Sequence, residues 1–561
     1  MNSSNKYNMR RMMMAALMLL CLPTLCCAQK DKRHLLNVGK NLEIFSQVYK
    51  HLDLMYVDSL NPEDVIGSGI KHMLESLDPY TEYYPEDDNK KLKMMITGKY
   101  AGIGALIRYN QQLKRVVIDE PYEGMPAMEA GLKKGDIILS IDGEDMSKKN
   151  VSEVSGKLRG DAGTTFTLKI KRPTTDKKMS LKITRRSIKL PEIPYYGMLE
   201  EGVGYLNLNS YTEGCAKQVR RAYIDLKKQG AEKFILDLRE NGGGSLSEAI
   251  DIINMWVPKG ITLVETKGKL QEANRAYTTR MEPVDTLMPL VVLVNENTAS
   301  ASEITAGSIQ DLDRGLVVGT RTYGKGLVQV PVSLPYNATL KLTTSKYYIP
   351  SGRCIQAINY KHTGGGYTER IPDSLTHVFH TRNGREVRDG GGIKPDIEVR
   401  PDTLPNIALY MERIDSTEVM HNFVIDYIAN HPTIAPPKEF SLTDEDYEAL
   451  KQRAIKSGFT YDHITEKKVD ELMELAKFEG YYDDAKEEFE RLKAKLRHNI
   501  ATDMDRHKQI IKQMVEADII PAYYYQRGAI EASVREDKAV KEALRLLKDE
   551  KEYQERLRLK E

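Results

Sequence analysis

Histidine is scarce in this chain of 561 residues and is missing from its middle. The sequence has 11 histidines, and none lies between His72 and His362. A Ser-His-Asp triad and a Cys-His pair both need histidine as the general base. A catalytic centre of either kind is therefore excluded for any domain built within that stretch.

Cysteine is also rare, with five residues in the whole chain. Three of them lie in the first 28 residues, and only Cys215 and Cys354 follow. Two isolated cysteines exclude a disulfide framework and favour ordinary buried thiols. An excess of charge is missing too, because 82 basic and 81 acidic residues give a net charge of +1. Nothing in this balance indicates nucleic acid as a partner.

Long apolar runs are absent except for a short one near the N-terminus. No later segment approaches the 18 consecutive apolar residues of a membrane-spanning helix. A basic stretch precedes the apolar residues 12–22, and a small-residue cleavage site ends at Ala28. This order predicts a signal peptide and hence an exported, periplasmic protein that is soluble after cleavage. Lipidation of Cys26 or Cys27 is the alternative.

The chain is long enough for several domains, and its pattern changes along its length. Apolar strands alternate with helical segments in the central part, which predicts an α/β core with crossover helices. Residues 327–332 and 339–347 are expected to complete its sheet. The expected fold class is multidomain α+β. The predicted parts are a signal peptide (1–28), an N-terminal helical region (29–95), an inserted β domain (96–187), the α/β core (188–400) and a C-terminal helical region (401–561).

Two polar turns follow predicted strands of the core. The strand 290–294 leads to Ser300, just before a predicted helix over 302–310. The strand 316–318 leads to Lys325, which lies between two glycines. A neutral lysine can replace histidine as the general base for a serine nucleophile, so the pair indicates a Ser–Lys hydrolase. The alternative is that Ser300 merely caps the helix and Lys325 is a solvated turn residue.

A third turn, residues 241–244, contains three consecutive glycines and follows the predicted strand 234–238. Acyl transfer needs backbone N–H groups aimed at the developing oxyanion, and glycine lets the backbone come close to it. We expect these donors to be Gly243, Gly244 and Ala301. A phosphate-binding loop is the rival interpretation, but no lysine–serine or lysine–threonine pair follows the glycines.

Further motifs occur in a fixed order along the first 400 residues. They are Leu77-Asp78-Pro79-Tyr80, Asp237-Leu238-Arg239-Glu240-Asn241-Gly242-Gly243-Gly244, Thr298-Ala299-Ser300-Ala301-Ser302-Glu303-Ile304, Gly319-Thr320-Arg321-Thr322-Tyr323-Gly324-Lys325-Gly326-Leu327-Val328-Gln329 and Gly392-Ile393-Lys394-Pro395-Asp396-Ile397. Together they resemble the carboxyl-terminal processing (tail-specific) protease family, whose members are PDZ-containing Ser–Lys serine peptidases. The resemblance covers roughly residues 35–400.

The resemblance implies roles for particular residues. Ser300 would be the nucleophile and Lys325 the base, with Gln329 hydrogen-bonded to the lysine. It also implies supporting roles for Glu303, Asp311 and Thr322. No metal or other cofactor is implied. His377 and His380 lie three positions apart, but no further ligand follows at a recognisable spacing.

Residues 96–187 resemble a PDZ domain of the circularly permuted kind found in exported proteases. Such a domain binds a peptide by adding it as a strand to an open sheet edge. The terminal carboxylate would be held by backbone N–H groups of the glycine-rich loop formed by Gly102, Ile103 and Gly104. The alternative is that these glycines only make a tight turn.

The sequence thus predicts an exported, ATP-independent serine endopeptidase that recognises protein C-terminal tails and cleaves near them. Its expected partners are proteins or peptides with free C-termini, and an adaptor lipoprotein and a homo-oligomer are further possibilities. Two other functions stay open. One is a catalytically silent PDZ scaffold on a protease-like fold. The other is a Ser–Lys amidase or esterase acting on small molecules, for which a PDZ domain has no obvious use.

Overall fold

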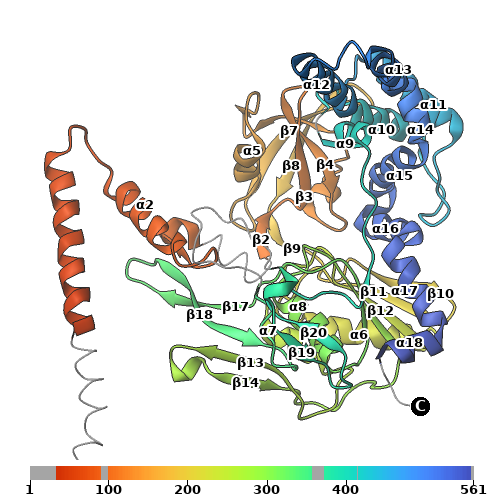
Figure 1. Ribbon diagram of the computed structural model, residues 1–561. Helices are drawn as coiled ribbons and strands as arrows, with labels where there is room; N and C mark the ends of the chain where they lie inside the picture. Colours follow the sequence, from red (N-terminus) through yellow and green to blue (C-terminus); the bar gives the residue numbers. More distant parts are fainter. Residues whose placement is uncertain (1–32, 90–98, 357–371, 414, 558–561) are drawn as a thin grey trace, which may run out of the picture. The chain divides into compact units, whose positions relative to one another are not determined.

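A computed structural model describes residues 33–89, 99–356, 372–413 and 415–557 (Figure 1). The predicted signal peptide lies outside the described residues. The chain divides into two compact units, one ending at Tyr83 and the other comprising nearly all of the chain that follows. Among the described residues, no helix is both long and apolar enough to cross a membrane.

The first unit is helical, as expected for the region before the β domain. One helix spans residues 33–55, and most of its apolar side chains are exposed. The next helix, α2 (Pro62–Glu75), begins as the sequence indicates. The Asn61 side chain accepts the N–H of Glu63 at 3.0 Å, and a proline takes the first helical position, where no N–H is needed.

A small β domain opens the second unit, and its main sheet has the order β3-β4-β5-β7-β8 with β6 paired to β5. The strands are β3 (Ala105–Asn110), β4 (Arg115–Pro121), β5 (Ile137–Ile141), β6 (Glu144–Asp145), β7 (Thr165–Arg172) and β8 (Lys177–Thr184). Their apolar faces close on helix α5 (Val151–Leu158). A separate ladder joins β2 (Lys99–Gly102) to β9 (Arg186–Lys189). Strand β3 therefore lies at an edge of the main sheet.

The α/β core is built on a six-stranded sheet with the order β10-β11-β12-β15-β16-β21. The strands are β10 (Tyr195–Glu200), β11 (Val203–Asn207), β12 (Lys233–Asp237), β15 (Leu290–Val294), β16 (Leu316–Gly319) and β21 (Ile397–Glu398). Only β10 is antiparallel to its neighbour. Since parallel strands end at the same edge of a sheet, the turns after β12, β15 and β16 lie along one edge.

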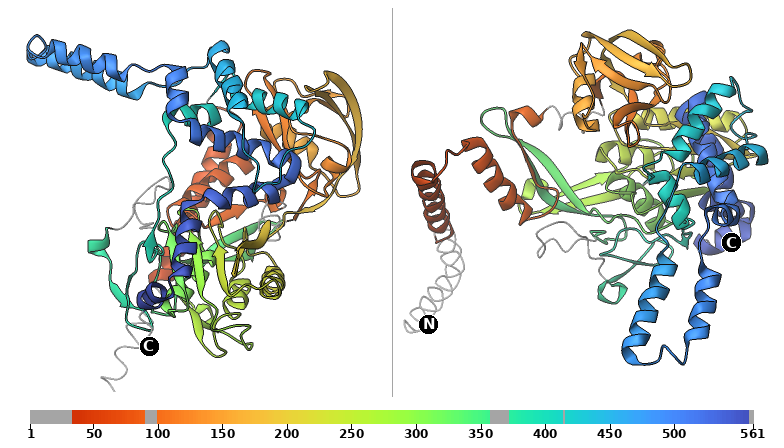
Figure 2. Two further views of the ribbon diagram at one scale, coloured as in Figure 1. Left: turned by 90° about the vertical axis from the view of Figure 1, so that its right-hand side faces the viewer. Right: turned by 90° about the horizontal axis from the view of Figure 1, so that it is seen from above.

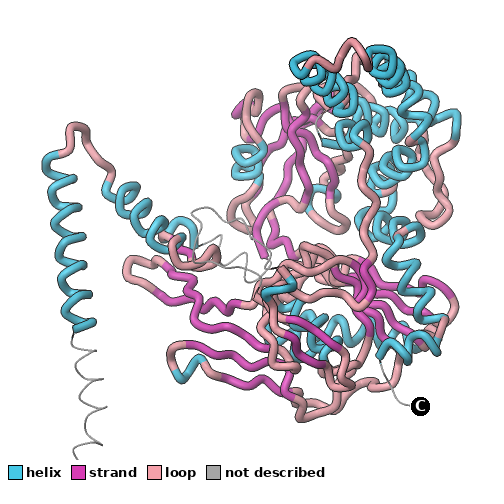
Figure 3. Tube along the Cα trace, in the orientation of Figure 1, coloured by secondary structure: helices cyan, strands magenta, loops and turns pink. Residues whose placement is uncertain are grey.

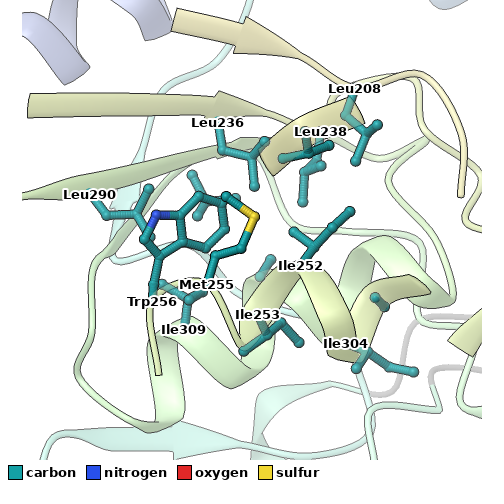
Figure 4. Close-up of a cluster of buried hydrophobic side chains, with 14 of the residues drawn as sticks. Leu208, Leu236, Leu238, Ile252, Ile253, Met255, Trp256, Leu290, Ile304 and Ile309 are labelled. Atoms are coloured by element: carbon teal, nitrogen blue, oxygen red, sulfur yellow. The ribbon is translucent and has the colours of Figure 1, made fainter. Parts of the chain in front are cut away.

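Helices cover both faces of this sheet, which explains why its strands are apolar throughout. One face packs on α6 (Cys215–Lys228), α7 (Leu246–Ile253) and α8 (Ala301–Asp311), and Figure 4 shows part of this core around Trp256. The other face packs on α17 (Lys538–Lys548) and α18 (Glu550–Leu557). The end of the described chain therefore completes the core of the α/β sheet.

The prediction that residues 327–332 and 339–347 complete the central sheet is wrong. Strands β17 (Leu327–Ser333) and β18 (Thr339–Tyr348) pair with each other. Strand β18 also pairs with β13 (Thr262–Gly268), which is followed by β14 (Arg275–Thr278), in a separate antiparallel sheet. The place beside β16 is taken by β21 instead. The half-exposed side chains of β17 and β18 suit an antiparallel sheet, whereas a doubly covered parallel sheet needs buried ones.

The C-terminal region is almost entirely helical (Figure 3), and a series of helices precedes α17 and α18. Its helices are α9 (Asn406–Arg413), α10 (Val419–Asn430), α11 (Asp444–Lys456), α12 (Ile464–Glu479), α13 (Lys486–Leu496), α14 (Ile500–Arg506), α15 (Lys508–Ile519) and α16 (Pro521–Glu536). All of them except α12 and α13 share one apolar core. Helices α12 and α13 form a projecting hairpin (Figure 2), and α13 has no buried residue.

Candidate active site

The three polar turns found in the sequence lie at the carboxyl ends of neighbouring parallel strands. Strand β12 leads to residues 241–244, β15 leads to Ser300, and β16 leads to Lys325. Open α/β sheets place their chemistry at such an edge. The fold therefore brings together segments that are up to 84 positions apart, from 241 to 325.

Ser300 occupies a sharp turn between β15 and α8. Its backbone has φ +57° and ψ −117°, which a residue other than glycine rarely adopts. An ordinary helix-capping serine has extended backbone angles, so the alternative of a plain cap does not account for this geometry. A strained strand-to-helix turn is typical of a serine nucleophile presented at a helix N-terminus. The serine is half-buried.

The Glu303 carboxylate joins the serine turn to the lysine turn. Its Oε2 accepts the backbone N–H groups of Ser300 at 2.8 Å and Lys325 at 2.9 Å. Its Oε1 accepts the hydroxyl of Thr322 at 2.6 Å and the N–H of Gly324 at 2.7 Å. Glu303 is fully buried. Burial raises its pKa to about 7, although the four hydrogen-bond donors act to lower it. One carboxylate therefore fixes the serine turn and the lysine turn relative to each other.

Tyr347, on β18, makes a second connection between the two turns. Its hydroxyl hydrogen-bonds the backbone carbonyl of Lys325 and lies 3.3 Å from that of Ser300. Its backbone N–H donates to the carbonyl of Gly326 at 3.0 Å. The sequence analysis missed this residue, and no signal could have found it. A tyrosine in a strand is most often a packing residue.

The glycine turn lies against the serine turn, but only part of the predicted oxyanion hole is available. A Cβ added to Gly243 would lie 2.8 Å from Cβ of Ser300. The N–H of Gly243 donates to Oδ1 of Asn241 at 2.9 Å, so this predicted donor is already engaged. The N–H groups of Gly244 and Ala301 have no acceptor in the part of the chain that the structure describes. These two donors fit the expectation better than Gly243 does.

Asn241 holds the glycine turn in place, a role that the sequence analysis did not assign. Its backbone carbonyl accepts the N–H of Ala299 at 3.0 Å and the hydroxyl of Ser302 at 2.9 Å. Its side-chain amide donates to the carbonyl of Leu208 at 2.7 Å. Asparagine often hydrogen-bonds its own turn, and this preference is the signal that could have identified it.

Gln329 does not take the place that the resemblance implies. Its amide donates to Oγ1 of Thr343 at 3.2 Å. Within the described residues, no hydrogen bond joins Gln329 to Lys325. The pairing of β17 with β18 shifts register between Val328 and Gln329. A bulge of this kind changes the direction of nearby side chains, which explains the difference.

Of the other two residues with predicted supporting roles, Thr322 contacts Glu303 directly and Asp311 lies far from Ser300. Oγ1 of Thr322 accepts the N–H of Ile393 at 2.7 Å, besides donating to Glu303, so it ties the motif at 392–397 to the site. Asp311 lies at the far end of α8, roughly 16 Å along the helix from Ser300. Its buried carboxylate accepts from Arg353 at 2.7 Å and stabilises the chain after β18.

The peptide-binding loop expected in the β domain has the form that a carboxylate site needs. The carbonyls of Ile103 and Gly104 accept N–H groups from Ala127 at 2.8 Å and Tyr122 at 2.9 Å. The N–H groups of Ile103 and Gly104 have no acceptor among the residues described. Gly104 has φ +69°, and a Cβ there would lie 2.5 Å from Cβ of Met125. Glycine is therefore required at this position.

Family models match three parts of the chain. The family model for peptidase family S41 matches residues 202–363, and a PDZ domain model matches residues 117–172. Residues 410–547 match the model "Probable PDZ-protease, C-terminal helical domain". The multidomain α+β fold class is confirmed by these matches.

Two curated relatives are carboxyl-terminal processing proteases. The protease of Bartonella bacilliformis is 35% identical over 326 residues, which cover 57% of this chain and 74% of the relative. That of a Picosynechococcus species is 37% identical over 296 residues, 52% of this chain and 70% of the relative. A solved photosystem II D1 C-terminal processing protease is 27% identical over 64% of this chain and 88% of its own, with a TM-score of 0.37.

The S41 core and these relatives make the chain a serine peptidase. It belongs to the carboxyl-terminal processing protease family, within peptidase family S41. The family resemblance inferred from the motifs is therefore confirmed.

Proposed function

We propose that this serine peptidase is exported and cleaves proteins near C-terminal tails that its PDZ domain recognises, with Ser300 as nucleophile and Lys325 as general base. The observation that carries the proposal is the shared Glu303 carboxylate, because it holds the strained serine turn and the lysine turn in a fixed relation. A helix-capping box would explain the bond from Glu303 to Ser300, but not the bonds from Glu303 to the lysine turn.

In the proposed reaction, the Ser300 hydroxyl attacks the scissile carbonyl while Lys325 takes its proton. The N–H groups of Ala301 and Gly244 would stabilise the oxyanion. The protonated lysine then gives its proton to the leaving amine, and the acyl-enzyme forms. Water, activated by the again neutral Lys325, releases the cleaved chain and restores the serine. The lysine must be neutral at the start of each acyl transfer.

Tail recognition rests on the open edge of the PDZ sheet. Strand β3 follows directly after the loop that ends at Gly104 and has only β4 as a neighbour in the main sheet. Helix α5 packs against the same domain core as β3. A peptide could add as a strand to β3, with its carboxylate on the N–H groups of Ile103 and Gly104. The names of the curated relatives agree with action at carboxyl termini.

The remaining sequence-based predictions enter this proposal unchanged. Export rests on the N-terminal pattern that ends at Ala28, and the domain limits are those predicted from the sequence pattern and the family resemblance. An adaptor lipoprotein and a homo-oligomer stay predictions.

The test compares unfolded substrate proteins of one sequence whose C-terminal group is either a free carboxylate or an amide. The enzyme, residues 29–561, should cleave the free acid faster and bind it about 1–3 kcal/mol more tightly, since amidation removes a charged acceptor. Ser300→Ala should bind the free acid normally and cleave nothing. Equal cleavage of both substrates would overturn tail recognition, and substantial proteolysis by a clean Ser300→Ala preparation would overturn the nucleophile.

A further inference from the structure

The PDZ domain is held against the C-terminal helical domain by charged contacts on the outer face of β3 and β4. Arg108 of β3 pairs with Glu418, which directly precedes α10. Lys134 is buried and bridges Asp119 of β4 at 2.8 Å and Asp518 of α15 at 2.6 Å. Removing one partner of a buried charge network is strongly destabilising, so these contacts fix the two domains together.

A cavity of about 330 Å³ lies at this contact. Arg108 and Asp119 line it from the PDZ sheet, and residues of α9, α10 and α15 line it from the helical domain. Three methionines contribute apolar surface: Met411, Met420 and Met514. Methionine surfaces adapt to differently shaped apolar groups, including the aliphatic stem of a long side chain.

Carboxylates outnumber cations in the lining. The four carboxylates are Asp119, Glu412, Glu418 and Asp518. Arg108 and Lys134 are the cations paired with them, as described above. His421 also lines the cavity, but burial lowers its pKa to about 4, so it adds no charge at neutral pH. Glu412 pairs at 3.5 Å with Arg413, which is exposed and outside the lining. The cavity is therefore net acidic.

The geometry of β3 fixes which residue of a bound tail faces this cavity. Side chains that face each other across an antiparallel ladder lie on the same side of the sheet. Ala105 and Ile107 pack toward the PDZ core, and Arg108 lines the cavity on the opposite face. If the last residue of the tail lies opposite Ala105, the residue three positions before it lies opposite Arg108. That residue would project toward the helical domain.

We infer that this cavity is a second specificity subsite, which selects a lysine or arginine three positions before the end of the substrate tail. The inference rests on the proposed tail recognition by the PDZ domain. The aliphatic stem of the side chain would lie along the methionines, and its charge would meet the excess carboxylates, with Glu412 as the main specificity-determining residue. The C-terminal helical domain then takes part in reading the tail, beyond holding the PDZ domain in place.

The test uses the full chain carrying Ser300→Ala, so that bound peptides stay intact, and fluorescent peptides whose binding is followed by anisotropy. The peptides share one sequence and carry lysine, alanine or glutamate three positions before the end. We expect lysine to bind about 3- to 10-fold more tightly than alanine, and glutamate more weakly than alanine. Lysine moved to two positions before the end, where it would face Ile107, should bring no gain.

Two variants assign the preference to the cavity. Glu412→Lys should abolish the preference for lysine. Glu445→Lys, the same charge change at an exposed residue of α11 outside the lining, should keep it. If free-acid peptides bind no better than amidated ones, tail recognition and this subsite both fail. If the free carboxylate matters but lysine brings no gain, or if the gain persists in Glu412→Lys, the subsite alone is overturned.

Discussion

Ser300 and Lys325 donate their backbone N–H groups to the same atom, Oε2 of Glu303, at 2.8 and 2.9 Å. Glu303, in the first turn of α8, thus links the turn after β15 to the turn after β16. A displacement of either turn would break a hydrogen bond to a buried carboxylate, which is costly. The relative position of the two proposed catalytic residues is therefore set by backbone contacts, before any contact between their side chains.

Replacing Glu303 by glutamine should disrupt this arrangement. The amide nitrogen cannot accept a hydrogen bond and would face two of the four donors that now bind the carboxylate. We expect kcat/KM to fall at least ~100-fold and stability to fall by about 1–3 kcal/mol for each donor left unsatisfied. Glu296→Gln is the matched control, because Glu296 is exposed and should change stability by less than about 0.5 kcal/mol. Equal activity of the two variants would contradict the account.

The raised pKa of Glu303 predicts a particular dependence of stability on pH. Its pKa lies at about 7 in the folded protein against 4.5 ordinarily, because burial disfavours the charged form. Between pH 4.5 and 7, the Glu303 side chain is ionised in the unfolded chain but protonated in the folded protein. Its contribution to the free energy of unfolding is therefore present below pH 4.5 and is lost as the pH rises to about 7. The difference corresponds to about 3 kcal/mol.

Thermal unfolding of the wild type and of Glu303→Gln across pH 4.5–8 measures this effect, because glutamine does not titrate. The Tm of the wild type minus that of the variant should fall as the pH rises to about 7 and then level off. A difference that rises with pH would show that Glu303 is stabilised as a carboxylate throughout.

Gly243 and Gly242 should respond very differently to alanine. Gly243 has φ +97°, and a Cβ there would lie 2.7 Å from the carbonyl oxygen of Ala299 and 2.8 Å from Cβ of Ser300. Gly242 has nothing within 4 Å of such a Cβ. We expect Gly243→Ala to lower kcat/KM at least ~100-fold and stability by about 1–3 kcal/mol. Gly242→Ala should stay within about threefold of the wild type, and a similar loss in both would refute the packing argument.

The hydroxyl of Tyr347 should matter for turnover more than for substrate binding. Tyr347→Phe removes the donor to the Lys325 carbonyl, with an expected loss of about 1 kcal/mol in stability and about tenfold in kcat at nearly constant KM. Tyr348→Phe serves as the control. The ammonium of Lys267 lies 4.6 Å from the Tyr348 ring centroid, a contact that phenylalanine keeps. Kinetics in which KM alone changes would assign Tyr347 to substrate binding.

The sequence predicted the position of the site better than its details. Ser300 and Lys325 could be paired because each follows a short, wholly apolar strand, and such strands are parallel neighbours in a covered sheet. The chemistry of acyl transfer led to the prediction that Gly243, Gly244 and Ala301 donate to the oxyanion. The central sheet was extended wrongly with residues 327–332 and 339–347, because a strand pattern does not reveal which sheet the strand joins.

Other features depend on tertiary contacts that no local pattern contains. Tyr347 lies 22 positions after Lys325, on strand β18 of a different sheet, and only the packing of that sheet brings its hydroxyl to the site. The direction of the Gln329 side chain depends on a register shift that the neighbouring residues do not predict. The sequence predicted a helical C-terminal region, but only the fold shows that its helix α17 covers the second face of the core sheet.

The most direct test of the Ser–Lys proposal is kcat/KM of Lys325→Arg, measured across pH beside Lys325→Ala. A base must lose its proton, and free lysine has a pKa of about 10.4, whereas arginine stays charged at any accessible pH. The account predicts that both variants lose at least ~1000-fold in kcat/KM at every pH. Activity of Lys325→Arg near that of the wild type would mean that Lys325 serves only as a cation, and would contradict the proposed mechanism.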